Sequence, residues 1–158
     1  MDQTKLKKIA SFTVNHDTLE KGMYVSRIDG DVITYDIRMK KPNQGDYLGT
    51  GEAHAFEHLF ATFARNQEDG DQIVYVGPMG CRTGFYLLTR DSMSRQRALD
   101  LVRDTCRFIV DFEGELPGSR PSECGNYRDQ NLPAAKRAAK DLLDVLRGWT
   151  VDDFQYKI

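Results

Sequence analysis

Alternating apolar and polar residues predict two β-strands near the start of the chain, at Met23 to Ile28 and at Val32 to Met39. The Asp-Gly pair between them is typical of a hairpin turn. In the second strand the apolar side chains share one face, and Arg38 projects from the opposite face. An arginine there fits a solvated surface as well as it fits a binding site, so the pattern leaves both interpretations open.

Helical spacing of apolar residues predicts three helices farther along. They extend from Thr50 to Asn66, from Ser92 or Ser94 to about Phe112, and from Pro133 to about Trp149. Two short β-rich runs, Gln72 to Val76 and Thr83 to Thr89, separate the first helix from the second. Strands and helices do not alternate strictly. This order therefore favours an α+β domain, with a largely antiparallel sheet packed against helices, over a parallel doubly wound one.

Length and composition are those of an ordinary globular protein. With 40% hydrophobic and 29% charged residues, residues 1–158 are expected to form one domain with its own core. The net charge of −2 gives no general attraction for nucleic acid or for an anionic membrane. No apolar run approaches the roughly 18 residues of a membrane helix, and Met1 to Ala10 is too polar for a signal peptide. Three widely separated cysteines, an odd number, predict free thiols in the cytoplasm.

The first predicted helix carries the strongest sign of chemistry, a His-x-x-Glu-His sequence. His54 and His58 are four residues apart, so their imidazoles fall on one helical face, with Glu57 on its flank. Two neutral nitrogens on consecutive turns suit a divalent metal, and the carboxylate lies within reach of a ligand of that metal. The alternative is a surface helix that happens to be rich in His and Glu. The apolar neighbours of the pair disfavour that alternative.

A third metal ligand must come from elsewhere in the chain, and the candidates are His16, Cys81, Cys124 and the carboxylates. Two nitrogens and one thiolate leave a fourth position open, which is typical of catalytic rather than structural sites. Spacing does not choose between Cys81 and Cys124. Whichever is not a ligand is expected to be a thiol that can exchange protons near neutral pH. Cys106 lies on the apolar stripe of its helix and is expected to be a core residue.

Five blocks of sequence resemble the S-ribosylhomocysteine lyase family, the LuxS-type synthases of the autoinducer-2 precursor. The blocks are Ser11 to His16; Tyr35 to Arg38 with Pro42 and Asn43; His54 to Ala61; Gly77 to Leu87; and Glu123 to Gly125 followed by Ala135 to Arg137. They occur in the family's order from near the N-terminus to the last helix, and the chain length fits. The Pro-Met-Gly-Cys-x-Thr-Gly block together with His-x-x-Glu-His is highly specific.

The resemblance implies an activity, a cofactor and an assembly. The activity is cleavage of S-ribosylhomocysteine to homocysteine and 4,5-dihydroxy-2,3-pentanedione, by two enediolate isomerisations and a β-elimination. The cofactor is one Fe²⁺ per chain, which Zn²⁺ or Co²⁺ can replace. The assembly is a homodimer with its active sites at the interface. Such an enzyme serves the methyl cycle and can supply autoinducer for quorum sensing.

The resemblance also assigns roles that spacing leaves undecided. His54, His58 and Cys124 match the metal ligands, Cys81 and Glu57 match the acid/base residues, and Ser11, His16 and Arg38 match positions that line the substrate pocket. Tyr75 is a departure, because the family pattern has an acidic residue six positions before the cysteine that Cys81 matches. One contact of the pocket is therefore in question.

Two other classes of protein share part of this pattern. His-x-x-Glu-His is also the signature of inverted zinc peptidases, in which the glutamate activates water. Those chains are usually far larger and take a downstream glutamate as third ligand. A small metal-stabilised binding module would require four protein ligands, whereas three are obvious here.

Overall fold

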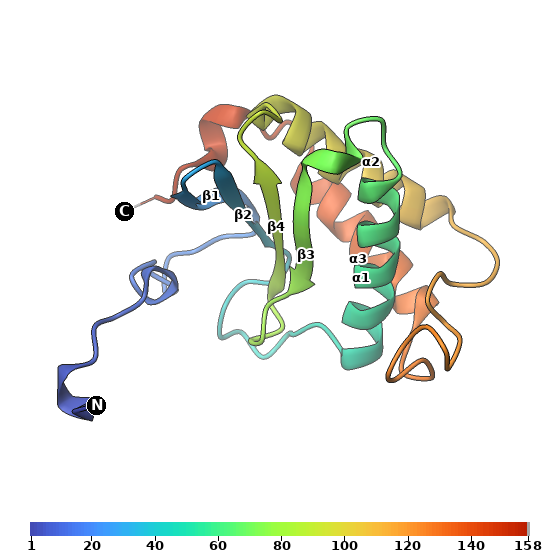
Figure 1. Ribbon diagram of the computed structural model, residues 1–158, viewed down its shortest axis with the longest axis horizontal. Helices are drawn as coiled ribbons and strands as arrows, with labels where there is room; N and C mark the ends of the chain where they lie inside the picture. Colours follow the sequence, from blue (N-terminus) through green and yellow to red (C-terminus); the bar gives the residue numbers. More distant parts are fainter. Residues whose placement is uncertain (158) are drawn as a thin grey trace.

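A four-stranded antiparallel sheet with three α-helices on one face forms the body of the protein (Figure 1). The structure is a computed structural model that describes residues 1–157. The strand order is β1-β2-β4-β3. The strands and α-helices are β1 (Gly22–Asp29), β2 (Val32–Arg38), α1 (Thr50–Arg65), β3 (Ile73–Pro78), β4 (Gly84–Arg90), α2 (Arg95–Asp111) and α3 (Leu132–Val145). The architecture confirms the predicted α+β class.

The alternation in β2 decides which face of the sheet lies under the helices. Tyr35 and Ile37 are fully buried, as are their β4 partners Leu87 and Phe85. Phe56 of α1 packs on Phe85 with the ring centroids 4.9 Å apart. Because burial of such a side chain contributes roughly 1.5–3 kcal/mol, these contacts fix α1 against the sheet.

Helix α1 follows the predicted range closely. At its first turn the Glu52 carboxylate accepts from the N–H of Gly49 at 2.8 Å, which satisfies one of the unpaired donors of a helix start. Its core face carries Ala53, Ala55, Phe56, Leu59, Phe60 and Ala64. His54, Glu57 and His58 are half-buried at the edge of this face, so the packing that holds the helix also aims the histidines.

Helix α3 ends earlier than its apolar pattern predicts, at Val145 rather than near Trp149. Gly148 has φ of +74°, in the left-handed region that favours glycine and ends helices. Trp149 turns back to the sheet, where its indole N–H donates to the carbonyl of Met23 at 2.9 Å. Its ring lies so close to Gly22 that a β-carbon has no room there. Trp149 therefore docks the segment after α3 onto β1.

Two further segments approach the sheet and α1. The loop of residues 112–131 links α2 to α3 and lies against the start of α1, where the N–H of Asn131 donates to the carbonyl of Gly51 at 2.9 Å (Figure 1). After α3, the 3₁₀ turn η4 (Val151–Phe154) inserts Phe154 into the core against Tyr35, with the ring centroids 5.6 Å apart. None of the helices described is both long and apolar enough to span a membrane.

Candidate active site

His54, His58 and Cys124 come together beside the first half of α1, although Cys124 is 70 residues from His54 in the sequence. One ligand atom from each of the three residues lies within 4.8 Å of the other two. The Cys124 sulfur is 3.3 Å from Nε2 of His54, and the two imidazole centroids are 4.5 Å apart. Of the two cysteines that spacing left open, the fold brings Cys124 to the histidine pair.

Backbone carbonyls orient both imidazole rings. Nδ1 of His54 is 2.8 Å from the carbonyl oxygen of Asp129, and Nδ1 of His58 is 2.9 Å from that of Pro117. A carbonyl can only accept, so each Nδ1 must donate and therefore carries the ring proton. Each Nε2 is then left with its lone pair available. Such outer hydrogen bonds fix the tautomer and direction of metal-binding histidines.

Gly118 allows the loop to approach this closely. A β-carbon at this position would lie 2.6 Å from Nδ1 of His58, and the backbone has φ of +71°. Both the missing side chain and the left-handed backbone are properties of glycine. The Pro117 carbonyl reaches His58 because the next residue is glycine.

The donor set fits a divalent transition metal. Two imidazole nitrogens and a thiolate are ligands of Zn²⁺ and Fe²⁺, whereas Mg²⁺ and Ca²⁺ prefer oxygen. The Cys124 sulfur also accepts from the N–H of Asn126 at 3.4 Å, which helps to fix its direction. Three protein donors leave a position for a non-protein ligand, as in catalytic sites.

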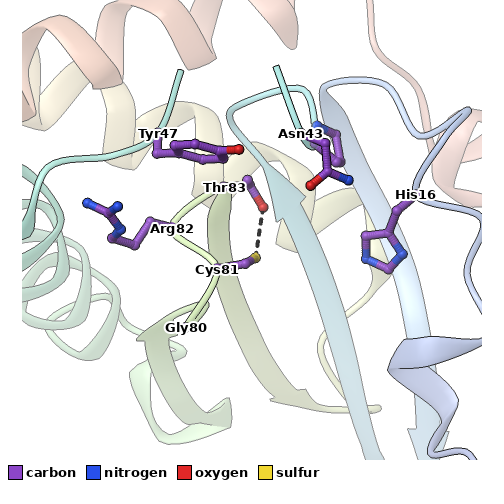
Figure 2. A pocket seen from close by; sticks show the side chains of 8 residues that line it. His16, Asn43, Tyr47, Gly80, Cys81, Arg82 and Thr83 are labelled. Atoms are coloured by element: carbon purple, nitrogen blue, oxygen red, sulfur yellow. Dashed lines mark hydrogen bonds between the residues drawn. The ribbon is translucent and has the colours of Figure 1, made fainter. Parts of the chain in front are cut away.

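Cys81 lines a cavity of about 350 Å³ that includes none of the three cluster residues (Figure 2). The other lining residues are His16, Pro42, Asn43, Tyr47, Gly80, Arg82 and Thr83. Asn43 and Arg82 have φ of +61° and +62°, a backbone conformation that is uncommon for non-glycine residues and clusters at functional sites. The Cys81 sulfur is accessible and lies 3.0 Å from the Thr83 hydroxyl.

Arg38 is only 3% exposed, so its interpretation as a solvated surface arginine is wrong. Its Nε and one terminal nitrogen donate to the Asp36 carboxylate at 3.1 and 2.7 Å, and the other terminal nitrogen donates to the Thr83 hydroxyl at 2.7 Å. Burial opposes the charge, but the Asp36 carboxylate more than offsets it and raises the pKa of Arg38. Thr83 thus joins the buried ion pair to the Cys81 wall of the cavity.

The remaining predicted site residues are divided among different parts of the chain. His16 lines the Cys81 cavity, and its Nδ1 is 2.8 Å from the carbonyl of Val14. Ser11 lines a second cavity of about 310 Å³, together with Tyr75, whose side chain lies over Gly77. Glu57 is half-buried on α1 and forms no side-chain hydrogen bond or ion pair within residues 1–157. The Cys81 cavity and the metal cluster share no residue.

Several side chains of the site were not singled out from the sequence. Thr83 lies inside the specific block around Cys81, and Asp36 precedes Arg38 by two residues on the same strand face, so an ion pair between them could have been inferred. The carbonyls of Pro117 and Asp129 carry no signal, because a backbone acceptor is independent of residue type. Tyr156, which donates to Asp36 at 2.7 Å, lies 120 residues away from it and had no signal either.

The fold, the metal cluster and the Cys81 cavity together define a small α+β metalloenzyme. Its metal site has three protein donors and is open to a further ligand, and its cavity holds a hydrogen-bonded thiol. The family model for S-ribosylhomocysteinase (LuxS) matches residues 9–152. The chain therefore belongs to the S-ribosylhomocysteinase (LuxS) family, as its sequence blocks predicted.

Curated relatives match over nearly their whole length. The S-ribosylhomocysteine lyase of Clostridium acetobutylicum is 47% identical over 156 residues, which cover 96% of this chain and 99% of the relative. The enzyme of the same name from Phocaeicola vulgatus is 48% identical, with 96% and 98% covered. That of Finegoldia magna is 41% identical, with 96% and 99% covered. The matched residues 9–152 include the metal cluster and every residue that lines the Cys81 cavity.

Proposed function

We propose that this chain is an S-ribosylhomocysteine lyase, which breaks the carbon–sulfur bond of S-ribosylhomocysteine to release homocysteine and 4,5-dihydroxy-2,3-pentanedione. The observation that carries the proposal is the cluster of His54, His58 and Cys124 in a chain that belongs to the family over nearly its whole length. A cytoplasmic location and a place in the methyl cycle and in autoinducer synthesis are part of the same proposal.

His54, His58 and Cys124 are the proposed ligands of one divalent ion, Fe²⁺, with Zn²⁺ or Co²⁺ as substitutes. The donor types, their mutual distances and the two orienting carbonyls support this assignment. When bound, such an ion supplies Lewis-acid polarisation of a carbonyl oxygen.

Cys81 is proposed to move the carbon-bound protons of the substrate. A thioether is a poor leaving group unless a carbonyl lies β to it, so the carbonyl must first migrate from C1 to C3. Each migration takes a proton from one carbon and returns a proton to its neighbour. The accessible Cys81 sulfur, held 3.0 Å from the Thr83 hydroxyl in a cavity, is suited to that exchange.

Glu57 is proposed to move the remaining protons. During the migrations it carries protons on and off the substrate oxygens. In the last step it takes the C4 proton, the C4–C5 double bond forms, and homocysteine leaves from C5 with the electrons of the C–S bond. Its half-buried carboxylate, adjacent to His58 in the sequence and without a fixed partner within residues 1–157, supports this role.

Ser11, His16 and Arg38 are proposed substrate contacts in an active site built from two copies of the chain. His16 and Cys81 line a cavity to which the metal cluster contributes no residue, and a second copy of the chain would supply a metal cluster to that cavity. Exposed apolar residues offer a surface for that contact. They include Leu6, Ile9 and Phe12 near the N-terminus, which are 64%, 56% and 67% exposed.

Release of free thiol from S-ribosylhomocysteine, measured with a thiol reagent, tests the function. The cobalt-loaded wild type is expected to release homocysteine. Cys81→Ala is expected to retain metal but to lose roughly 10²–10⁴-fold in turnover, because a positioned acid/base group contributes about that much. Glu57→Gln should lose turnover similarly and accumulate a ketone, because its elimination step is slowed most.

Cys106→Ser is the matched control for Cys81→Ala. It also removes a cysteine, but from the fully buried core, so it should lower stability and leave turnover almost unchanged. Near-normal thiol release by Cys81→Ala would contradict the acid/base assignment. An inactive wild type would contradict the lyase function, and casein hydrolysis would indicate a peptidase instead.

The ligand assignment is tested by elemental analysis of purified protein. His54→Ala, His58→Ala and Cys124→Ala should each lose most of their metal, because each removes one of the three protein donors that cluster within residues 1–157. Full occupancy in Cys124→Ala would transfer that role to another residue, with Cys81 as the first candidate.

A further inference from the structure

One face of the sheet carries no α-helix within residues 1–157 (Figure 1). A buried ion pair between Asp36 and Arg38 lies on this face. Asp36 and Arg38 are 1% and 3% exposed there. Tyr24 of β1 and Tyr86 of β4 are the cross-strand neighbours of Asp36 and so share its face. A buried ion pair is stable only when further hydrogen bonds satisfy its remaining polar atoms. What covers this pair therefore decides how firmly it is held.

Tyr156 covers the pair from outside the sheet. Its hydroxyl donates to Oδ2 of Asp36 at 2.7 Å, and its ring stacks on that of Tyr24 with centroids 5.0 Å apart. Burial raises the pKa of Tyr156, and the nearby Asp36 carboxylate raises it further, so the phenol stays protonated and can donate. The contact is therefore a charge-assisted hydrogen bond, which is stronger than a neutral one.

The segment that carries Tyr156 is anchored on both faces of the sheet. Two residues earlier, Phe154 is 1% exposed and packs on Tyr35 on the helical side. Tyr35 and Asp36 are consecutive in β2, so their side chains point to opposite faces. The chain after η4 thus passes around the edge strand β1, and Tyr156 is held in place from two directions.

A continuous set of hydrogen bonds leads from Tyr156 to Cys81. The Arg38 guanidinium can only donate, so the Thr83 hydroxyl must accept from it at 2.7 Å. The hydroxyl proton of Thr83 is then free for a second partner. The Cys81 sulfur lies 3.0 Å from this hydroxyl, nearer than the Met79 sulfur at 3.9 Å.

We propose that Tyr156 is a positioning residue for Cys81: it fixes the Asp36 carboxylate and, through Arg38 and Thr83, directs the hydroxyl proton that faces the Cys81 sulfur. The catalytic consequence rests on the proposed acid/base role of Cys81. The chemical consequence, the reactivity of the thiol, does not depend on that role and can be measured separately.

The test compares Tyr156→Phe with Tyr24→Phe. Each variant removes one phenolic hydroxyl from the same ring stack, but the Tyr24 hydroxyl donates to the carbonyl of Glu20 and not to the ion pair. The rate at which iodoacetamide alkylates Cys81 at pH 7 is measured by peptide mass spectrometry. Tyr156→Phe should slow alkylation at pH 7 severalfold, because the less firmly held Thr83 hydroxyl then donates less well to the Cys81 sulfur. Tyr24→Phe should match the wild type.

A double-variant experiment tests the route through Thr83. In a Thr83→Ser background, which keeps the hydroxyl, Tyr156→Phe should slow alkylation by its full factor. In a Thr83→Val background, which removes it, Tyr156→Phe should have no further effect. A slowing of the same size in both backgrounds would overturn the proposed route, and equal rates for Tyr156→Phe and Tyr24→Phe would overturn the proposal as a whole.

The lyase assay separates this inference from the proposed function. Tyr156→Phe should lower kcat for thiol release by a factor similar to its effect on alkylation. If the wild type released no thiol but the alkylation differences were observed, the proposed function would fail and the positioning role of Tyr156 would stand. If the wild type released thiol normally but Tyr156→Phe left the alkylation rate unchanged, the proposed function would stand and the positioning role of Tyr156 would fail.

Discussion

At the scale of single residues, the distance between a loop and a ring decides whether His58 can be oriented. Gly118 has no β-carbon, and a β-carbon there would lie 2.6 Å from Nδ1 of His58. Gly114, four residues earlier in the same loop, also has a left-handed backbone with φ of +103°, but no atom of residues 1–157 lies within 4 Å of the position that a β-carbon would take there. The two positions separate the effect of backbone strain from the effect of crowding the ring.

Gly118→Ala is expected to weaken metal binding by about 10- to 100-fold, because it displaces the ring or the Pro117 carbonyl that orients it. Gly114→Ala should have a similar backbone cost, on the order of 1 kcal/mol of unfolding free energy, without that loss. Competition with a chelator measures the affinity, and urea unfolding measures the stability. Equal metal affinity in the two variants would show that Gly118 is needed only for its left-handed backbone conformation and not to leave room for the His58 ring.

The sequence could identify residues that share one element but not partners from distant ones. His54 and His58 could be paired from their spacing, because one helix carries both. Cys124 could be chosen over Cys81 only through the family resemblance, because their place relative to α1 depends on the path of a long loop. The burial of Arg38 could not be foreseen, because Tyr156, which covers its partner Asp36, comes from the other end of the sequence.

At the scale of elements, the cap of α3 is linked to the metal cluster. The Asn131 side chain accepts from the N–H of Ala134 at 3.1 Å and closes the first turn of the helix. Its own N–H donates to the carbonyl of Gly51 in α1. Asp129, two residues earlier, provides the carbonyl that orients His54. The start of α3 thus sets the position of one ring of the cluster.

Asn131→Ala should cost about 1 kcal/mol of unfolding free energy through loss of the cap. It should also weaken metal binding by about three- to tenfold, because the Asp129 carbonyl is held less firmly. Ser94→Ala is the control, since Ser94 caps α2 in the same way, accepting from the N–H of Arg97 at 3.0 Å, at the start of a helix that supplies none of the cluster residues. The two variants should unfold alike in urea, and a similar fall in metal affinity in both would refute the link.

Element types followed from periodicity, but one boundary did not. The hairpin of β1 and β2 and the three helices occur where the alternation and the helical spacing predicted them. The end of α3 was predicted too late, because apolar spacing continues past Val145 although Gly148 and the docking of Trp149 end the helix. The tertiary contacts with Gly22 and Met23 show that Trp149 packs against β1.

At the scale of the whole molecule, burial of Cys106 makes the protein less stable as the pH becomes alkaline. Burial raises the pKa of this thiol to about 12, whereas an unfolded cysteine has a pKa of about 8.5. Above pH 8.5 the unfolded chain releases the proton and the folded chain keeps it, so unfolding becomes more favourable as pH rises. The stability that the neutral thiol contributes is fully present below pH 8.5 and is lost between pH 8.5 and 12, by roughly 1.4 kcal/mol per pH unit.

Cys106→Ala removes this titration. The variant should be less stable than the wild type at pH 7 by about 1–2 kcal/mol, because it loses buried volume. The difference should shrink by roughly 2 kcal/mol between pH 8.5 and pH 10, which urea unfolding at fixed protein concentration would measure. A difference that stays constant with pH would mean that the Cys106 thiol does not lose its proton more readily in the unfolded chain than in the folded one.

Assembly from two copies is tested by mixing inactive variants. If His16 acts at the metal site of a second chain, His54→Ala mixed with His16→Ala should recover activity. Random exchange of subunits would then leave about a quarter of the sites intact. His16→Ala mixed with Cys81→Ala should stay inactive, because both residues line the cavity of one chain. No recovery in the first mixture, with subunit exchange verified, would rule out the crossed arrangement.

The residues that build the site and that dock the segment after α3 come from distant parts of the chain, and this has a consequence for folding kinetics. His54 and Cys124 are separated by 70 residues, Asp36 and Tyr156 by 120, and Met23 and Trp149 by 126. Chains dominated by such contacts fold slowly, because loops must close before the contacts form. An isolated α1 offers a metal only two imidazoles, so a partly folded chain lacks the thiolate donor. The complete set of ligands is expected to arise in the last steps of folding, after the segment that follows α3 has docked on β1 and β2.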